Sequence, residues 1–300
     1  MQKNNLINRL RLPVIVAPMF LVSGPELVIA SSNSGLIGSF PGPNARTTEE
    51  LEKWMRKITE GTSNPWAFNI ITHKTYDRFD DELDLIKKFQ PKIVITALGS
   101  PERVIEEVHL YGGKVIADVN NINFARRCAD MGVDGMALIC HGAGGHTGQL
   151  SPFAFTSYVR EFFDGIIVLA GSISTGNHIK AAKLLNADLC YMGTRFISAT
   201  ESQAVDEYKT MVINSNYSDL RMTNLFTGAQ AYYMKDSIIR NNLDPDNLES
   251  NLAGFNVSAS QEKISAWKDI WSAGQGVGLI KRVESVESIV AELEAEFLQR

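Results

Sequence analysis

A histidine framed by glycines is the sharpest chemical signal in the sequence. His146 lies in the segment 142–148, in which four of the seven residues are glycine. A glycine-rich backbone can lie close against a ligand, and an imidazole takes up and releases protons near neutral pH. A single His in a loop is usually a surface residue, but the surrounding glycines favour an acid–base role for His146. His141 lies nearby, yet no further ligands follow at a spacing typical of a metal site, so we expect no bound metal.

Two pairs of small residues predict a phosphate-binding site. Gly171-Ser172 and Gly193-Thr194 each follow an apolar run and carry no bulky side chain. Their backbone N–H groups can therefore approach an anion closely. Either pair alone could be an ordinary tight turn. Both together, after the seventh and eighth apolar runs, match the place where α/β barrels bind phosphate.

The elements that must position these residues form a repeating pattern. Short apolar runs rich in β-branched residues alternate with segments of helical spacing, which predicts βα alternation. The predicted strands are 14–19, 36–40, 66–71, 92–97, 114–119, 135–140, 166–170 and 189–192. Eight such units close a (β/α)₈ barrel, so the sequence predicts an α/β fold, a TIM barrel with a C-terminal added lobe.

The domain organisation follows from where this alternation stops. We expect the barrel over 1–214 and an Asn-rich, aromatic lobe or cap over 215–270. The last part, 271–300, is expected to return to the barrel. Its final helix is predicted from apolar residues that share one helical face, namely Val286, Ile289, Val290, Leu293 and Phe297. In the lobe, Tyr232 and Tyr233 could line a pocket with Phe226, although aromatic pairs are more often part of a core.

Composition excludes several classes of protein. The 300 residues are 44% hydrophobic and 21% charged, which excludes a disordered or fibrous protein. The net charge of −5, without a basic stripe, argues against nucleic acid as a partner. The three scattered cysteines do not form a disulfide framework and favour a cytoplasmic location. Pro13 and Pro18 interrupt the N-terminal apolar run, so we expect no signal peptide and no membrane association.

Several motifs together resemble a known family. The motifs are P-x-x-x-A-P-M at 13–19, A-G-G-H at 143–146, and A-G-S-I followed by M-G-T-R-F between 170 and 196. They resemble the FMN-dependent nitronate monooxygenases, long called 2-nitropropane dioxygenases. The segment S-A-G-Q-G-V-G-L-I at 272–280 is similar to a late flavin-contacting stretch of that family. Flavin-dependent enoyl-acyl-carrier-protein reductases share the architecture, and the motifs separate the two groups poorly.

The resemblance implies FMN as cofactor and a role for each matching residue. His146 would stand over the flavin ring as the acid–base residue. The loop around Met19 would line the ring, Asn69 would hydrogen-bond it, the two small-residue pairs would hold the phosphate, and Gln275-Gly276 would close over the cofactor. The implied FMN contacts are Ala17, Pro18, Met19, Asn69, Gly144, Gly145, Gly171, Ser172, Gly193, Thr194, Gln275 and Gly276. Many relatives carry Glu where this chain has Gly142, and Gly where it has Ser172.

The implied reaction is the oxidation of nitronates, or of related small carbon acids such as nitroalkanes, with O₂ as the second substrate. One alternative is an enoyl-acyl-carrier-protein or quinone reductase, in which NAD(P)H would reduce the flavin. Another is a phosphate-binding isomerase, aldolase or lyase without flavin, but such enzymes usually need a Lys or paired carboxylates at the strand ends. The strand ends here offer only Asp118, which we interpret as a strand-end turn or helix cap. A homodimer is compatible with the sequence.

Overall fold

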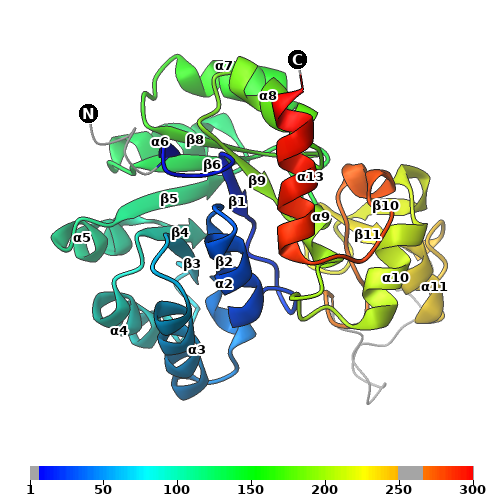
Figure 1. The fold of residues 1–300 in the computed structure, drawn as a ribbon, viewed down its shortest axis with the longest axis horizontal. Coiled ribbons are helices and arrows are strands. Elements are labelled where there is room, and N and C mark those ends of the chain that lie inside the picture. Colours follow the sequence, from blue (N-terminus) through cyan, green and yellow to red (C-terminus); the bar gives the residue numbers. More distant parts are fainter. Residues whose placement is uncertain (1–6, 249–265, 300) are drawn as a thin grey trace.

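The structure is a barrel of eight parallel strands surrounded by helices (Figure 1). This computed structural model describes residues 7–248 and 266–299. The barrel strands are β1 (Val14–Val16), β2 (Gly38–Pro41), β3 (Trp66–Ile71), β4 (Ile93–Ala97), β5 (Lys114–Val119), β6 (Gly135–Ile139), β8 (Ile166–Ala170) and β9 (Leu189–Met192). They pair in the order β1-β9-β8-β6-β5-β4-β3-β2, and a parallel bridge between Ile15 and Ile37 joins the two ends. The predicted TIM barrel is confirmed.

Most predicted strands coincide with observed ones, and the exceptions have physical causes. Strands β3, β5, β8 and β9 have the predicted bounds. Strand β1 ends at Val16 rather than at residue 19, because the chain turns at Pro18, which has no N–H to donate. Strand β2 begins at Gly38, two residues later than predicted.

The helices cover the outside of the barrel (Figure 1). They are α2 (Pro25–Asn33), α3 (Thr48–Gly61), α4 (Phe79–Phe89), α5 (Glu102–Leu110), α6 (Ile122–Asp130), α7 (Pro152–Arg160), α8 (Gly176–Leu184) and α9 (Thr194–Ile197). Several begin with a side chain that accepts a hydrogen bond from the first turn: Thr47 accepts from Glu50 N, and Asn121 accepts from Phe124 N. Such caps satisfy backbone donors that the helix leaves free.

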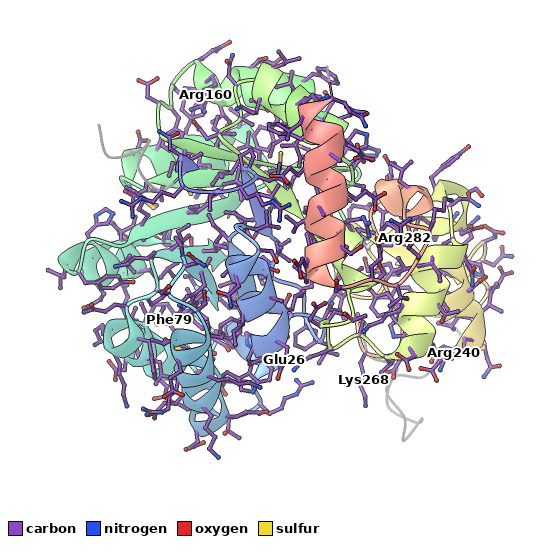
Figure 2. The ribbon with its side chains drawn as sticks, in the orientation of Figure 1. Glu26, Phe79, Arg160, Arg240, Lys268 and Arg282 are labelled. Atoms are coloured by element: carbon purple, nitrogen blue, oxygen red, sulfur yellow. The ribbon has the colours of Figure 1, made fainter. Side chains whose placement is uncertain are left out.

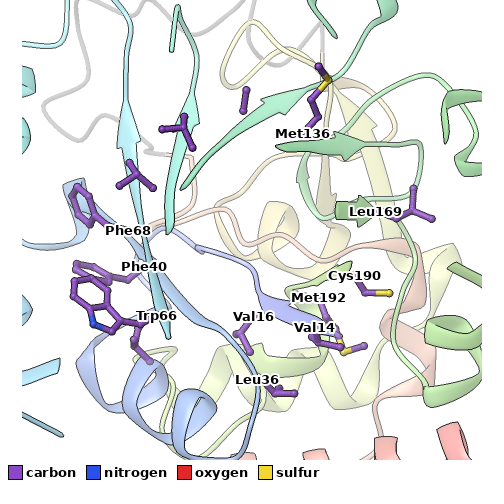
Figure 3. Packing of buried hydrophobic residues seen from close by; sticks show 14 of the residues in the cluster. Val14, Val16, Leu36, Phe40, Trp66, Phe68, Met136, Leu169, Cys190 and Met192 are labelled. Carbon is purple, nitrogen blue, oxygen red and sulfur yellow. The ribbon is translucent and has the colours of Figure 1, made fainter. Parts of the chain in front are cut away.

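The core has two layers, because side chains of a strand alternate between its two faces. In β8, Ile166 and Val168 point into the barrel, and Ile167 and Leu169 point toward the helices. Figure 3 shows the outer layer, in which Phe40, Trp66 and Phe68 gather; the ring centroids of Phe40 and Phe68 lie 5.3 Å apart. Burial of both faces explains why the strands are nearly continuous apolar runs.

A second group of elements lies beside the barrel (Figure 1), and it begins before residue 215, where the added lobe was expected to start. It contains α10 (Asp206–Asn214), β10 (Leu220–Thr223), β11 (Ala231–Met234) and α11 (Lys235–Arg240). Strand β11 pairs with β10 and also with the short strand β7 (Gly145–His146), which comes from the segment after β6. The lobe is thus joined by backbone hydrogen bonds to the glycine-framed histidine. Residues 249–265 of the expected lobe lie outside the described residues.

The C-terminal helix α13 (Val286–Leu298) packs on α8 and α2. A cluster of charges holds the segment before it. The buried Arg195 guanidinium of α9 donates to Glu284 at 2.8 Å and to Glu292 at 2.9 Å. Arg282, labelled beside α13 in Figure 2, pairs with the same two carboxylates. Within the described part of the chain, no helix has the length and apolar character needed to cross a bilayer.

Candidate active site

A cavity of about 840 Å³ opens at the carboxyl ends of the barrel strands, where TIM barrels place their active sites. Residues that follow all eight barrel strands line it together with residues of the lobe. The structure brings these sequence-predicted residues to its wall: Ala17, Pro18, Met19, Asn69, Gly144, Gly145, His146, Gly171, Ser172, Gly193, Thr194 and Gly276. Gln275 is not among the lining residues, and its side-chain Nε2 donates to the Tyr232 hydroxyl at 2.7 Å.

The loop after β1 is held against the cavity by a residue that sequence reasoning missed. Asn44 is buried, and its Nδ2 donates to Met19 O at 2.9 Å and to Ser23 O at 2.7 Å. Its Oδ1 accepts from the N–H of Leu21 at 2.8 Å, where the backbone has a φ of 63°. This left-handed conformation is unfavourable for Leu. Asn44 therefore fixes the loop that carries the predicted flavin contacts at Ala17 to Met19.

Asn69 lies at the cavity from the middle of β3 and is buried. Its side-chain Nδ2 donates to the carbonyl of Ile95 on the neighbouring strand β4, at 3.2 Å. This bond fixes the orientation of the amide. The Oδ1 atom remains as an acceptor.

Glycines allow three backbone segments to come unusually close at one end of the cavity. A Cβ atom at Gly144 would lie 2.8 Å from Gly274 N, and one at Gly276 would lie 2.2 Å from the Ser174 hydroxyl. Gly274 N donates to the Thr194 hydroxyl at 2.9 Å, which joins this segment to the end of β9. A side chain at Gly144 would require a shift of the Gly274 backbone, and one at Gly276 would require the Ser174 hydroxyl to move.

The same end of the cavity carries the two predicted phosphate-binding pairs. Gly171 has a φ of 127° and Ser172 a φ of 57°, so the chain turns sharply directly after β8. None of the described residues that line the cavity is Lys or Arg. An anion bound at this end would therefore be held by backbone N–H groups and by the Ser172 and Thr194 hydroxyls.

His146 enters the cavity from the small sheet. Its Nε2 lies 3.1 Å from the Thr227 hydroxyl, and its ring stands edge-on to Trp267 with centroids 5.4 Å apart. Thr227 Oγ1 donates its one hydrogen to Ala229 O at 3.2 Å, so it accepts from His146. Nε2 is then the protonated nitrogen, and Nδ1 carries the free lone pair. The His146 side chain is exposed at the cavity, and the partial burial of its ring lowers its pKa.

Asp118 has a different place from the one expected. It is not the cap of α6, because Asn121 performs that role, and instead it lines the cavity. Its Oδ1 is buried without a hydrogen-bond partner, and burial raises the pKa of the carboxyl to about 7. The strand pattern could have shown this, because Ile116 points into the barrel and Asp118, two residues on, shares its face.

The remaining aromatic and histidine residues divide between core and cavity. Tyr232 and Tyr233 are buried and do not line the cavity, which confirms the core interpretation, whereas Trp267 and Tyr208 line it and were missed. His141 Nε2 lies 3.1 Å from the Tyr232 hydroxyl. Across the described ranges, no cluster of His, Cys, Asp or Glu could hold a metal ion.

Comparison with known proteins identifies the family. The family model described as nitronate monooxygenase matches residues 72–296. The chain belongs to the nitronate monooxygenase family. It is accordingly an oxidoreductase.

Relatives of this family match along nearly the whole chain. A probable nitronate monooxygenase of Staphylococcus saprophyticus is 27% identical, over 93% of this chain and 94% of the relative. Among solved structures, FabK from Thermotoga maritima has a TM-score of 0.81 at 24% identity and covers 99% of this chain and 95% of its own. A nitroalkane oxidase from Streptomyces ansochromogenes has the same TM-score at 22% identity, with 97% of both chains covered. These two structures support the fold.

Two departures from the pattern of many nitronate monooxygenases prove to be neighbours in space. Ser172 Oγ lies 3.5 Å from Gly142 O. A Cβ atom at Gly142 would lie 2.2 Å from the same Ser172 Oγ, and the φ of Gly142 is 88°. The Ser172 hydroxyl thus occupies space that a side chain at position 142 would need. The two positions are sterically coupled.

Proposed function

We propose that the protein is an FMN-dependent oxidoreductase that oxidises alkyl nitronates or nitroalkanes with O₂. The observation that carries this proposal is His146. Its ring projects into the cavity with Nε2 bonded to Thr227, which leaves Nδ1 as a base. It is the only imidazole among the described residues that line the cavity.

The residues present fit FMN. Gly144, Gly171 and Gly276 line the cavity without side chains, so a phosphate can approach their backbone, and the Ser172 and Thr194 hydroxyls add donors. Asn69 offers a side-chain amide to the ring, and buried polar atoms without partners remain at Asp118 and Tyr191. When bound, FMN would supply the redox chemistry by accepting electrons from the substrate.

The protein's part in the reaction is to move a proton and to position the substrate. A nitroalkane is a carbon acid, and the neutral His146 can take its α-proton at Nδ1. Because burial lowers the pKa of His146, the ring is neutral and able to accept a proton at neutral pH. Trp267, edge-on to the ring, and Thr227, bonded to Nε2, hold the imidazole in one orientation. A preformed nitronate has already lost that proton and needs only binding.

An anaerobic reduction experiment tests the proposal. Purified protein should be yellow, mass spectrometry should identify FMN, and propyl nitronate should bleach the flavin rapidly in a stopped-flow instrument. NADH and NADPH should bleach it slowly or not at all. Fast bleaching by a nicotinamide, together with inertness toward nitronates, would replace the proposal by an enoyl-acyl-carrier-protein or quinone reductase. A colourless protein that cannot be reconstituted with FMN would refute both.

A further inference from the structure

Two buried polar groups at the barrel side of the cavity lack hydrogen-bond partners. The Asp118 Oδ1 and the Tyr191 hydroxyl are both buried and unpaired. Within the described ranges, they are the only such side-chain atoms that belong to residues lining the cavity. A buried polar group without a partner costs on the order of 1–3 kcal/mol. Two in one cavity indicate that an occupant of the cavity provides their partners.

The two groups come from strands of the barrel, whereas His146 comes from the small sheet. Tyr191 is a residue of β9 whose side chain lies in the barrel interior, together with Ile116 from the face of β5 that also carries Asp118. The charge of Asp118 raises the pKa of the Tyr191 hydroxyl further, beyond the effect of burial, so the two groups are electrostatically coupled. His146 comes instead from β7, which is paired with the lobe.

Few other charges act on Asp118. The other titratable residues around the cavity are His146, Tyr76 and Tyr208, and Asp118 is the only carboxyl group among the described lining residues. Burial lowers the pKa of His146 and raises those of both tyrosines, so all three are uncharged at neutral pH. The two adjacent strands contribute Ile93 and Ile95 from β4 and Ala137 and Ile139 from β6 to the barrel interior, and none of these is charged.

We propose that Asp118, with Tyr191, contacts the flavin ring from the barrel side, and that the proton on Asp118 sets how easily the flavin is reduced. This inference rests on the proposed FMN cofactor. A protonated carboxyl has one O–H donor, which can stabilise the negative charge that a ring gains when it accepts electrons. An ionised carboxylate at the same place repels that charge. The electrons come from the substrate. Asp118 keeps its proton during the reduction, so no bond to the carboxyl is made or broken.

The proton makes reduction depend on pH in a definite direction. Burial raises the pKa of Asp118 to about 7, so the carboxyl ionises across neutral pH. As the pH rises, the growing carboxylate population makes the flavin harder to reduce. The relevant measurement is therefore the reduction potential of the FMN-loaded protein from about pH 5.5 to about pH 9.

The test compares the wild type with Asp118→Asn, which keeps the shape and a donor but cannot ionise. Between about pH 6 and about pH 9, the ratio of reduced to oxidised FMN at a fixed potential should fall roughly tenfold more in the wild type, which is about 30 mV for a two-electron couple. Tyr191→Phe should keep this pH dependence and weaken FMN binding roughly three- to tenfold. Glu82→Gln is the matched control. Glu82 is a buried carboxyl whose pKa is also raised to about 7, but it does not line the cavity.

The outcomes separate the inference from the function on which it rests. If FMN binds and the wild type and Asp118→Asn show parallel pH dependences, Asp118 does not set the potential, although the proposed function stands. If Glu82→Gln also removes the pH dependence, the effect is not local to the ring and the inference is wrong. Should Asp118→Asn fail to fold, Tyr191→Phe decides, because an unchanged FMN affinity would contradict contact from the barrel side. Failure of the wild type to bind FMN would overturn both.

Discussion

The hydroxyl of Thr227 lies 3.1 Å from Nε2 of His146, and through it the lobe determines which nitrogen of the candidate base is free. The same hydroxyl donates to Ala229 O, so it acts as an acceptor toward the imidazole. His146 is further held by strand pairing with Ala231. The lobe therefore positions the acid–base residue as well as lying beside the cavity.

Thr227→Val should weaken proton abstraction without loss of FMN. The substitution keeps the shape but removes the acceptor for Nε2–H, so the imidazole is free to adopt the other tautomer. We expect kcat/KM for a neutral nitroalkane to fall roughly tenfold, about 1.4 kcal/mol in the barrier. Thr227→Ser should restore most of the activity, because it returns the hydroxyl. A valine variant with wild-type kcat/KM and an unchanged pH profile would show that Thr227 has no positioning role.

His146→Ala should affect activity on a neutral nitroalkane and activity on the preformed nitronate to different extents. Removing a general base typically costs 10²-fold or more, so turnover of neutral nitroalkanes should fall by roughly that factor. Oxidation of the preformed nitronate should fall much less, because its proton is already gone. The FMN content, measured by absorbance after gel filtration, should be unchanged. Equal losses on both substrates would mean that His146 does something other than take the proton.

The sequence predicted the barrel well because a parallel strand buried on both faces is a continuous apolar run, and strands such as 66–71 and 114–119 have no competing pattern. Twelve of the residues expected from the sequence also line one cavity in the structure, because the strand ends of a barrel converge. Contacts between distant segments could not be predicted in the same way. Nothing near Asn44 in the sequence indicates that its side chain donates to Met19 O, and nothing near Thr227 indicates that it contacts His146. Both pairings depend on tertiary packing.

Asp118 shows a different limit of prediction from the sequence. Its place after an apolar run fits both a helix cap and an inward-facing side chain, and Asn121 competes for the cap. The register of β5 decides between them, because a shift of one residue would turn Asp118 away from the barrel interior. The sequence contained that alternation, but its meaning depends on knowing which face of the strand is the inside.

Gly142 and Ser172 should behave as a coupled pair in a double-mutant cycle. Gly142→Ala places a Cβ atom 2.2 Å from Ser172 Oγ and forces Ala into a φ of 88°, so it should reduce FMN affinity by tenfold or more, about 1.4 kcal/mol. Ser172→Gly alone should have little effect on folding, because Gly accepts the φ of 57° more readily than Ser.

The double variant tests the coupling. With the Ser172 hydroxyl removed, Gly142→Ala should lose less FMN affinity than it does alone, and only the backbone strain and the contact with Gln275 should remain. Fluorescence titration of FMN onto the four proteins measures the interaction free energy. Strictly additive effects would show that the two positions are not linked through this contact.

The pH dependence of folding should distinguish two aspartates whose pKa values are shifted in opposite directions. Burial raises the pKa of Asp118 to about 7, so between about pH 4 and pH 7 the folded state binds more protons than the unfolded state, and the wild type loses stability as the pH rises. Asp118→Asn removes this loss. In protein without FMN, its free energy of unfolding should match the wild type below about pH 4 and exceed it by up to about 4 kcal/mol above pH 7.

For Asp134, the change of folding stability with pH should have the opposite sign. Burial acts to raise the pKa of its carboxyl, but hydrogen bonds from Val115 N, His109 and Lys114 outweigh this effect and hold the pKa below its usual value. The folded state then binds fewer protons, so this stability is present above the unfolded pKa and is lost as the pH falls through the folded one. Asp134→Asn should therefore destabilise the protein at neutral pH and have a shrinking effect in acid. Urea unfolding of both variants from about pH 4 to about pH 8 measures the two trends, and trends of the same sign would contradict the assignment of Asp118 as a buried carboxyl without a partner.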